Sequence, residues 1–203
     1  MGRLRLLSLS LLLVPWLAIG QETPDSIEWF HPNQEVRVRD LPSQTVFSKE
    51  PSTVLATELE MVLQNKAVCC GRDSSLGDEA LAAPLSLKEL SAKLQGRHFL
   101  SDGRPILVKA QYLQANAINS GVVVGGLLAG HAELFEWKSR VYVLYGAIYN
   151  ETLYYSGARQ YAIVKLLLLD PRFSDQGRLV MFDRQMDDLG NVQGLLSLAV
   201  EPQ

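Results

Sequence analysis

The chain has 203 residues, 47% of them hydrophobic, so it is long enough and apolar enough to fold around a core rather than stay disordered. Its 19 basic and 22 acidic residues are well mixed and give a formal net charge of −3. That balance, without a basic stripe or a polybasic segment in the sequence, argues against nucleic acid and anionic lipid as partners.

The first twenty residues have the pattern of an export signal. Arg3 and Arg5 form a short basic start, and the stretch Leu6–Ile19 is mostly apolar. Small residues at Ala18 and Gly20 predict cleavage before Gln21. The apolar run is short and interrupted, so we expect a signal peptide over residues 1–20, with an uncleaved membrane anchor as the alternative.

Cleavage would remove two of the basic residues and none of the acidic ones, which leaves a mature net charge of −5. The mature chain then has no second apolar run that predicts a membrane span. The pattern therefore predicts an exported protein, periplasmic or extracellular.

Residues 21–50 form a polar lead-in with several prolines, which is typical of an extended arm. Within it, Val36 and Val38 alternate with charged residues and predict one short strand over Glu35–Arg39. Residues 51–203 are then expected to form a single α+β domain.

Two helices are expected at the start of this domain. Helical spacing of leucine and valine predicts the first over Thr53–Lys66. The second, over Leu87–Gln95, carries stronger local signals, because Ser86 and Glu89 form a capping box and Gly96 is a natural stop.

The rest of the chain has β character. The glycine-rich apolar stretch Gly121–Leu128 belongs to this part, Lys138-Ser139 reads as a tight turn, and Asn150–Gln160 reads as a long hairpin loop. The predicted strands are Pro105–Tyr112, Ala132–Trp137, Val141–Tyr149, Tyr161–Leu169, Leu179–Asp183 and Leu195–Val200. The fold class expected is therefore α+β, with N-terminal helices followed by a mostly antiparallel sheet.

The two cysteines of the chain, Cys69 and Cys70, are adjacent. A disulfide between neighbours closes a strained eight-membered ring, so a free thiol in an exported protein is the expectation. Three interpretations follow: a buried pair or a disulfide to another chain, a redox or metal handle, and a nucleophile. The pattern assigns no role to Cys69 and no oligomeric state.

For a nucleophile, the order of the polar residues along the chain has chemical sense. His131 would take the proton of the Cys70 thiol, and Asp170 would orient the imidazole. The side-chain amide of Gln64 would donate to the oxyanion that forms on the substrate. These four are the candidate catalytic residues.

At these positions the chain resembles the papain-like cysteine peptidases, in particular the bacterial C39-like branch. The matching residues are Gln64, Cys70-Gly71, Gly130-His131 and Asp170-Pro171, and the resemblance spans roughly Glu58 to Phe173. It implies a papain-like fold and a thiol peptidase or amide hydrolase that acts on a peptide or protein. It implies no cofactor and no metal.

The alternative is a non-enzymatic exported module of the same fold with an inactive site. Such a module would bind a protein or peptide partner through a sheet edge or through the hairpin at Tyr154-Tyr155.

Overall fold

The structure is a computed structural model. It describes residues 26–39, 41, 51–65, 86–100, 102–172, 178–183 and 192–203, and for residues 51–53, 64 and 178–183 the backbone alone.

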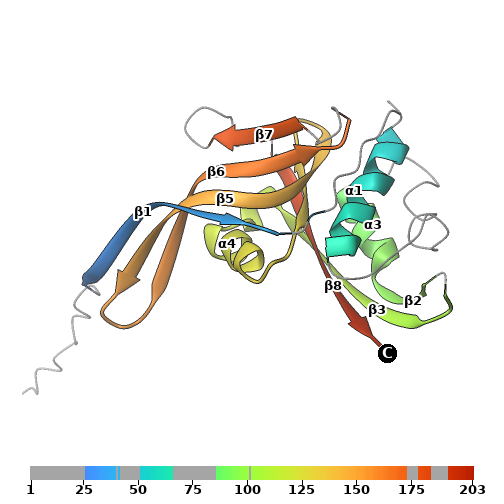
Figure 1. Cartoon of the computed structure of the whole chain (residues 1–203), viewed down its shortest axis with the longest axis horizontal. Helices are drawn as coiled ribbons and strands as arrows, with labels where there is room; N and C mark the ends of the chain where they lie inside the picture. The colour runs from blue at the N-terminus through green and yellow to red at the C-terminus, as the bar shows by residue number, and fades with distance from the viewer. Residues whose placement is uncertain are drawn as a thin grey trace, which may run out of the picture.

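Eight strands in the described part of the chain form one antiparallel sheet (Figure 1). Seven lie in the spatial order β2-β3-β8-β4-β5-β6-β7, and β1 pairs with β5 beside this path. Their bounds are β1 Ile27–Arg37, β2 Gly96–Phe99, β3 Pro105–Gln114, β4 Glu133–Trp137, β5 Arg140–Tyr154, β6 Arg159–Asp170, β7 Arg178–Asp183 and β8 Val192–Pro202.

The α+β class and the antiparallel sheet are confirmed, but the helices are interspersed among the strands instead of preceding them. Helix α1 (Pro51–Asn65) follows β1, α3 (Leu87–Leu94) follows in the chain, and α4 (Ser120–Leu128) lies between β3 and β4. The expected order of helices first and sheet second is therefore corrected.

Helix α4 occupies the glycine-rich stretch that had been assigned to the β part. Its first turn is fixed by Asn119, whose side-chain oxygen accepts a hydrogen bond from the Val122 N–H at 2.9 Å. Buried Val123 and Leu127 pack the helix against β1, β5 and β6. Tertiary packing thus overrides the low helix propensity of glycine and valine in this segment.

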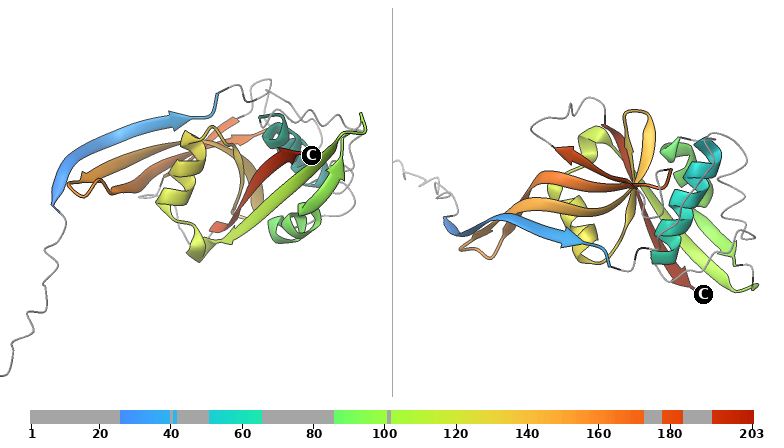
Figure 2. Two further views of the ribbon diagram at one scale, coloured as in Figure 1. Left: turned by 90° about the horizontal axis from the view of Figure 1, so that it is seen from below. Right: turned by 45° about the horizontal axis from the view of Figure 1, so that its top comes forward.

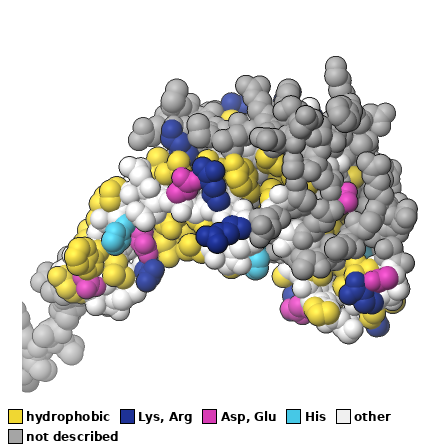
Figure 3. All heavy atoms as spheres, in the orientation of Figure 1, with side chains coloured by type: hydrophobic (Ala, Val, Ile, Leu, Met, Phe, Trp, Pro, Cys, Tyr) yellow, Lys and Arg dark blue, Asp and Glu magenta, His cyan; other side chains and the backbone are white. Residues whose placement is uncertain are grey.

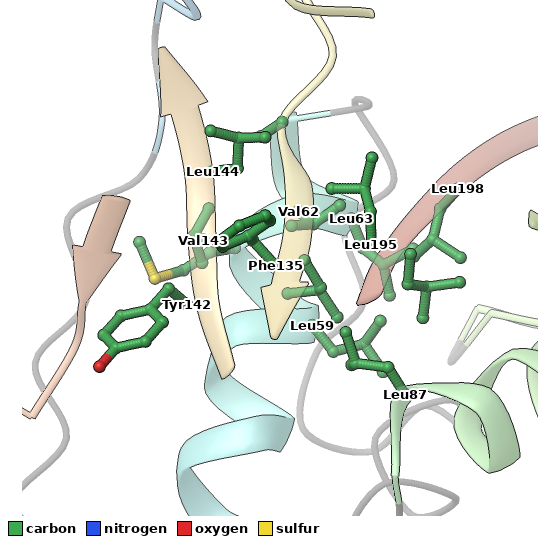
Figure 4. Close-up of a cluster of buried hydrophobic side chains, with 14 of the residues drawn as sticks. Leu59, Val62, Leu63, Leu87, Phe135, Tyr142, Val143, Leu144, Leu195 and Leu198 are labelled. Atoms are coloured by element: carbon green, nitrogen blue, oxygen red, sulfur yellow. The ribbon is translucent and has the colours of Figure 1, made fainter. Parts of the chain in front are cut away.

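One core joins the helices to the middle of the sheet. Helix α1 packs against β4 and β5, and α3 packs against β3 and β8. Figure 4 shows the contact region, to which α1, α3 and the central strands contribute large aliphatic side chains around Phe135. Members of this cluster are Leu59, Val62, Leu63, Leu87, Phe135, Val143, Leu144, Leu195 and Leu198.

Strand β5 is long enough to serve two partners. Its first part, Arg140–Leu144, pairs with β4, and the rest, Gly146–Tyr154, pairs with β1. Strand β6 runs along both parts. The ends of β1, β5 and β6 therefore continue past the body as a three-stranded arm, which Figures 1 and 2 show projecting from one end of the molecule.

The arm changes two expectations from the sequence. The strand in the lead-in begins earlier than predicted, at Ile27 instead of Glu35. The long loop predicted over Asn150–Gln160 is instead the end of a hairpin, with a tight turn in which Gly157 has φ +84°. Neither segment has a buried residue, so strand pairing, and not burial, forms them.

Two turn and cap predictions agree with the structure. Lys138 and Ser139 both have positive φ, 53° and 57°, and connect β4 to β5 as a two-residue hairpin turn. Ser86 caps α3: its side chain accepts from the Glu89 N–H while the Glu89 carboxylate accepts from the Ser86 N–H at 2.9 Å.

Candidate functional site

The predicted nucleophile lies outside the described residues, as do Cys69 and Gly71. Gln64 is in the last turn of α1, where the structure describes its backbone only. The catalytic roles of Cys70 and Gln64 therefore stay predictions.

His131 lies between α4 and β4 with an exposed side chain. Its N–H donates to the Gly126 carbonyl at 3.0 Å. The next residue, Ala132, donates its N–H to the side-chain oxygen of Asn65, the last residue of α1, at 3.0 Å. The end of α1, from which the chain continues toward Cys70, thus lies beside His131.

The structure places a buried carboxyl group near His131 that the sequence patterns did not predict. Glu133, the first residue of β4, is buried against α4, and a Cβ added at Gly126 would lie 2.9 Å from its Oε1. The absence of a side chain at Gly126 makes room for this carboxyl group. Its position between the apolar residues Ala132 and Leu134 at the start of a short strand was the available signal.

Asp170 ends β6 and is buried in an ion pair with Arg172. The Arg172 Nε donates to Asp170 Oδ1 at 2.7 Å, the Nη2 donates to Oδ2, and the Arg172 N–H donates to Oδ1 at 3.1 Å. This bidentate arrangement uses both carboxylate oxygens.

Strand register separates Asp170 from His131. Leu144 of β5 pairs with Glu133 on one side and with Leu168 on the other. His131 lies two residues before Glu133, and Asp170 lies two residues after Leu168. Because β4 and β6 both run antiparallel to β5, these two offsets add, and they separate the residues by about 13 Å along the strands. Across the sheet the two residues are two strand spacings apart. The structure brings the end of α1 to His131 but does not bring Asp170 there.

Glu58 of α1 is fully buried near Asp170 and Arg172. Neither of its carboxylate oxygens has a hydrogen-bond partner among the described residues. Burial raises the pKa of Glu58 well above its ordinary value, the nearby Asp170 raises it further, and Arg172 lowers it in part. We call Glu58, Asp170 and Arg172 the buried acid cluster.

The sequence held a signal for this cluster, because Glu58 stands on the apolar face of α1, three residues after Leu55 and four before Val62. A neutral carboxyl group beside an ion pair can hold a proton in the core, but the cluster is closed to solvent at Glu58. It therefore offers buried acid–base groups and no open surface at Glu58 for a substrate.

Among the described residues, no group of three or more His, Cys, Asp or Glu side chains is arranged to hold a metal ion. The metal or redox interpretation concerned Cys69 and Cys70, which are outside this part of the chain.

Comparison with protein families, with curated proteins and with solved structures gave no match to this chain. The resemblance to papain-like peptidases therefore stays a prediction from the residues quoted for it. In the part of the chain that is described, no helix is long and apolar enough to cross a membrane.

Proposed function

We propose that this protein is an exported thiol hydrolase of the papain-like type that acts on a peptide or amide bond. The observation that supports it is the hydrogen bond from the Ala132 N–H to the Asn65 side chain. Through it Asn65, which ends the helix that carries Gln64 and lies five residues before Cys70, is held beside His131.

In this proposal the Cys70 sulfur attacks the carbonyl carbon and His131 takes the thiol proton. The Gln64 amide donates to the oxyanion. The imidazolium then gives its proton to the leaving amine as the carbon–nitrogen bond breaks, and water hydrolyses the thioester. Asp170 is held by Arg172, so the proposal leaves it a structural role and uses a Cys–His pair.

The adjacent cysteines supply a matched pair of variants for the test. We expect the Cys69→Ser protein to react with iodoacetamide at pH values well below the ordinary thiol pKa of about 8.5, because His131 activates the remaining thiol. Cys70→Ser should lose this reaction and the cleavage of a fluorogenic peptide library together. His131→Ala in the Cys69→Ser background should return the labelling profile to that of an ordinary thiol.

The proposal fails if the Cys69→Ser protein labels only near and above the ordinary thiol pKa. It fails as well if Cys69→Ser and Cys70→Ser have the same profile, because then Cys70 has no special environment.

A second candidate is the non-enzymatic binding module, and one observation favours it. The end of the arm exposes several large apolar side chains, an arrangement that usually marks an interaction site. In this candidate, replacement of Cys70 leaves function intact and replacement of the exposed side chains on the arm removes it.

A further inference from the structure

The end of the arm, which we call the arm tip, consists of residues 26–30 and 153–159. Four of its side chains are large, apolar and more than half exposed: Ile27 58%, Trp29 59%, Phe30 55% and Tyr155 69%. In Figure 3 hydrophobic side chains gather over this end of the molecule. Strands β1 and β5 are joined at the tip by the pairing of Ile27 with Tyr154. Just beyond β5, the Tyr155 N–H donates to the Ser26 carbonyl at 3.1 Å.

The apolar side chains lie on both faces of the arm. Trp29 pairs with Leu153 and Phe30 pairs with Thr152 in regular register, so Trp29 and Phe30 point to opposite faces. A flat partner surface would cover one face and leave the other in water. A medium that surrounds the tip on all sides covers both.

The apolar region is shallow and ends at charged side chains. The distance along β1 from Ile27 to Phe30 is about 10 Å. The next residue, His31, pairs with Glu151, whose carboxylate accepts a hydrogen bond from Arg159 at 3.0 Å. This depth matches the roughly 5–10 Å to which interfacial elements enter the headgroup and acyl boundary of a bilayer.

The charged groups at and beside the tip are Glu28 and the ion pair of Glu151 with Arg159, which together leave a net charge of −1. The mature chain is acidic, so attraction to anionic lipid does not contribute. Tryptophan and tyrosine, both present at the tip, are the side chains that prefer the membrane–water interface, where the ring is buried and its polar edge stays hydrated.

The arm tip also contains the first described residue of the chain, Ser26. The five residues from Gln21 to Asp25 separate the predicted leader from the arm tip, and they span at most about 18 Å. A leader that enters the bilayer during export therefore carries the tip to the membrane surface.

A second copy of the chain is a poorer fit to the arm. Strand β1 would have to offer its edge, but Pro32 lies in it and its pairing with β5 shifts register between Ile27 and Trp29 and again between His31 and Gln34. Proline and bulges are features that protect edge strands from pairing.

From these observations we infer that the arm tip inserts Ile27, Trp29, Phe30 and Tyr155 into the surface of a zwitterionic phospholipid bilayer and holds the exported body there. Nothing in this inference depends on the hydrolase proposal, and it makes the membrane surface the place where the body meets its substrate or partner.

The test uses the chain from Gln21 onward, with vesicles of phosphatidylcholine alone in a flotation assay. Phe30→Ser is compared with Phe99→Ser, because Phe99 is equally exposed at 54% but lies in β2, away from the arm. We expect the chain to float with the vesicles, Phe30→Ser to lower the partition coefficient at least about tenfold, and Phe99→Ser to leave it unchanged.

Trp29 supplies a second readout, because Trp16 is removed with the leader and the other remaining tryptophan, Trp137, is 4% exposed. Addition of vesicles should shift Trp29 emission to the blue and allow quenching by brominated lipid, and Trp29→Phe should abolish both. Absence of flotation, an equal loss in both serine variants, or binding that requires anionic lipid overturns the inference. So does a dimer that Phe30→Ser dissociates without any flotation.

Discussion

At the residue scale, the most unusual feature is a fully buried carboxyl group without a hydrogen-bond partner among the described residues. An unpaired carboxylate in the core costs several kcal/mol, whereas its protonated form costs much less. Glu58 is in that position, while Asp170 beside it is compensated by Arg172. Two buried carboxyl groups thus lie beside one partly buried guanidinium, and burial raises the pKa of Glu58.

The raised pKa of Glu58 makes stability depend on pH with a definite sign. The folded-state pKa of Glu58 is raised above its ordinary value of 4.5, so the stability it contributes is complete below about pH 4.5 and is lost as the pH rises toward the raised pKa. In urea unfolding from about pH 5 to about pH 8, we expect the wild type to lose up to about 1.4 kcal/mol per pH unit from this group. Glu58→Gln, which is neutral at every pH, should lack that slope.

The control for this prediction is Glu60→Gln, which lies on the same helix and is less buried. It should retain the slope of the wild type. Equal slopes in Glu58→Gln and the wild type would mean that Glu58 is charged in the folded protein.

A second contact at this scale joins a glycine to an aromatic ring. A Cβ added at Gly194 of β8 would lie 2.3 Å from the ring of Tyr112 on β3. We expect Gly194→Ala to lower the free energy of unfolding by about 1–3 kcal/mol, because the ring must move. In a double-mutant cycle measured by chemical denaturation, Tyr112→Ala should remove part of that cost, so additive effects would contradict the contact.

At the scale of the elements, helices α3 and α4 form for different reasons. Ser86 and Glu89 specify the start of α3 within four residues of sequence. Helix α4 has the Asn119 cap but also three glycines in nine residues, and it depends on packing against β1, β5 and β6. One helix is therefore specified locally and the other by its neighbours.

The capping box gives a direct test of the local contribution. Ser86→Ala removes the acceptor for the Glu89 N–H and the hydroxyl that donates to the Glu89 carboxylate. We expect a loss of about 1 kcal/mol in the free energy of unfolding by urea titration. Lys88→Ala, exposed on the same helix, should change stability by less than about 0.5 kcal/mol, and a comparable loss in both variants would rule out the cap as the cause.

At the scale of the whole molecule, the sheet has a covered body and an exposed arm. Strands β4 and β8 are central, with β4 mostly buried and β8 buried in its middle, whereas β1 is exposed along nearly its whole length. Few buried contacts hold the arm, so its backbone hydrogen bonds should open without unfolding of the body.

Hydrogen exchange followed by mass spectrometry tests this difference. We expect amides of Ile27–Gln34 to exchange through local opening, at least about 100-fold faster than amides of β4 and β8, which require global unfolding. Phosphatidylcholine vesicles should slow exchange at the arm tip alone. Equal protection of β1 and β4 would show that the arm opens only together with the body.

The sequence by itself determined the features that depend on neighbouring residues: the span of α1, the capping box of α3, the turn at Lys138-Ser139 and the positions of the central strands. It did not determine α4, the length of β1 or the shape of the arm, because these depend on pairing and packing between segments far apart in the chain. The positions of the polar candidate residues likewise depend on pairing and packing between distant segments. Sequence order predicted that Asp170 would lie with His131, but strand register sets them apart. Asp170 instead pairs with Arg172, two residues later in the chain, and packing of α1 brings Glu58 near it.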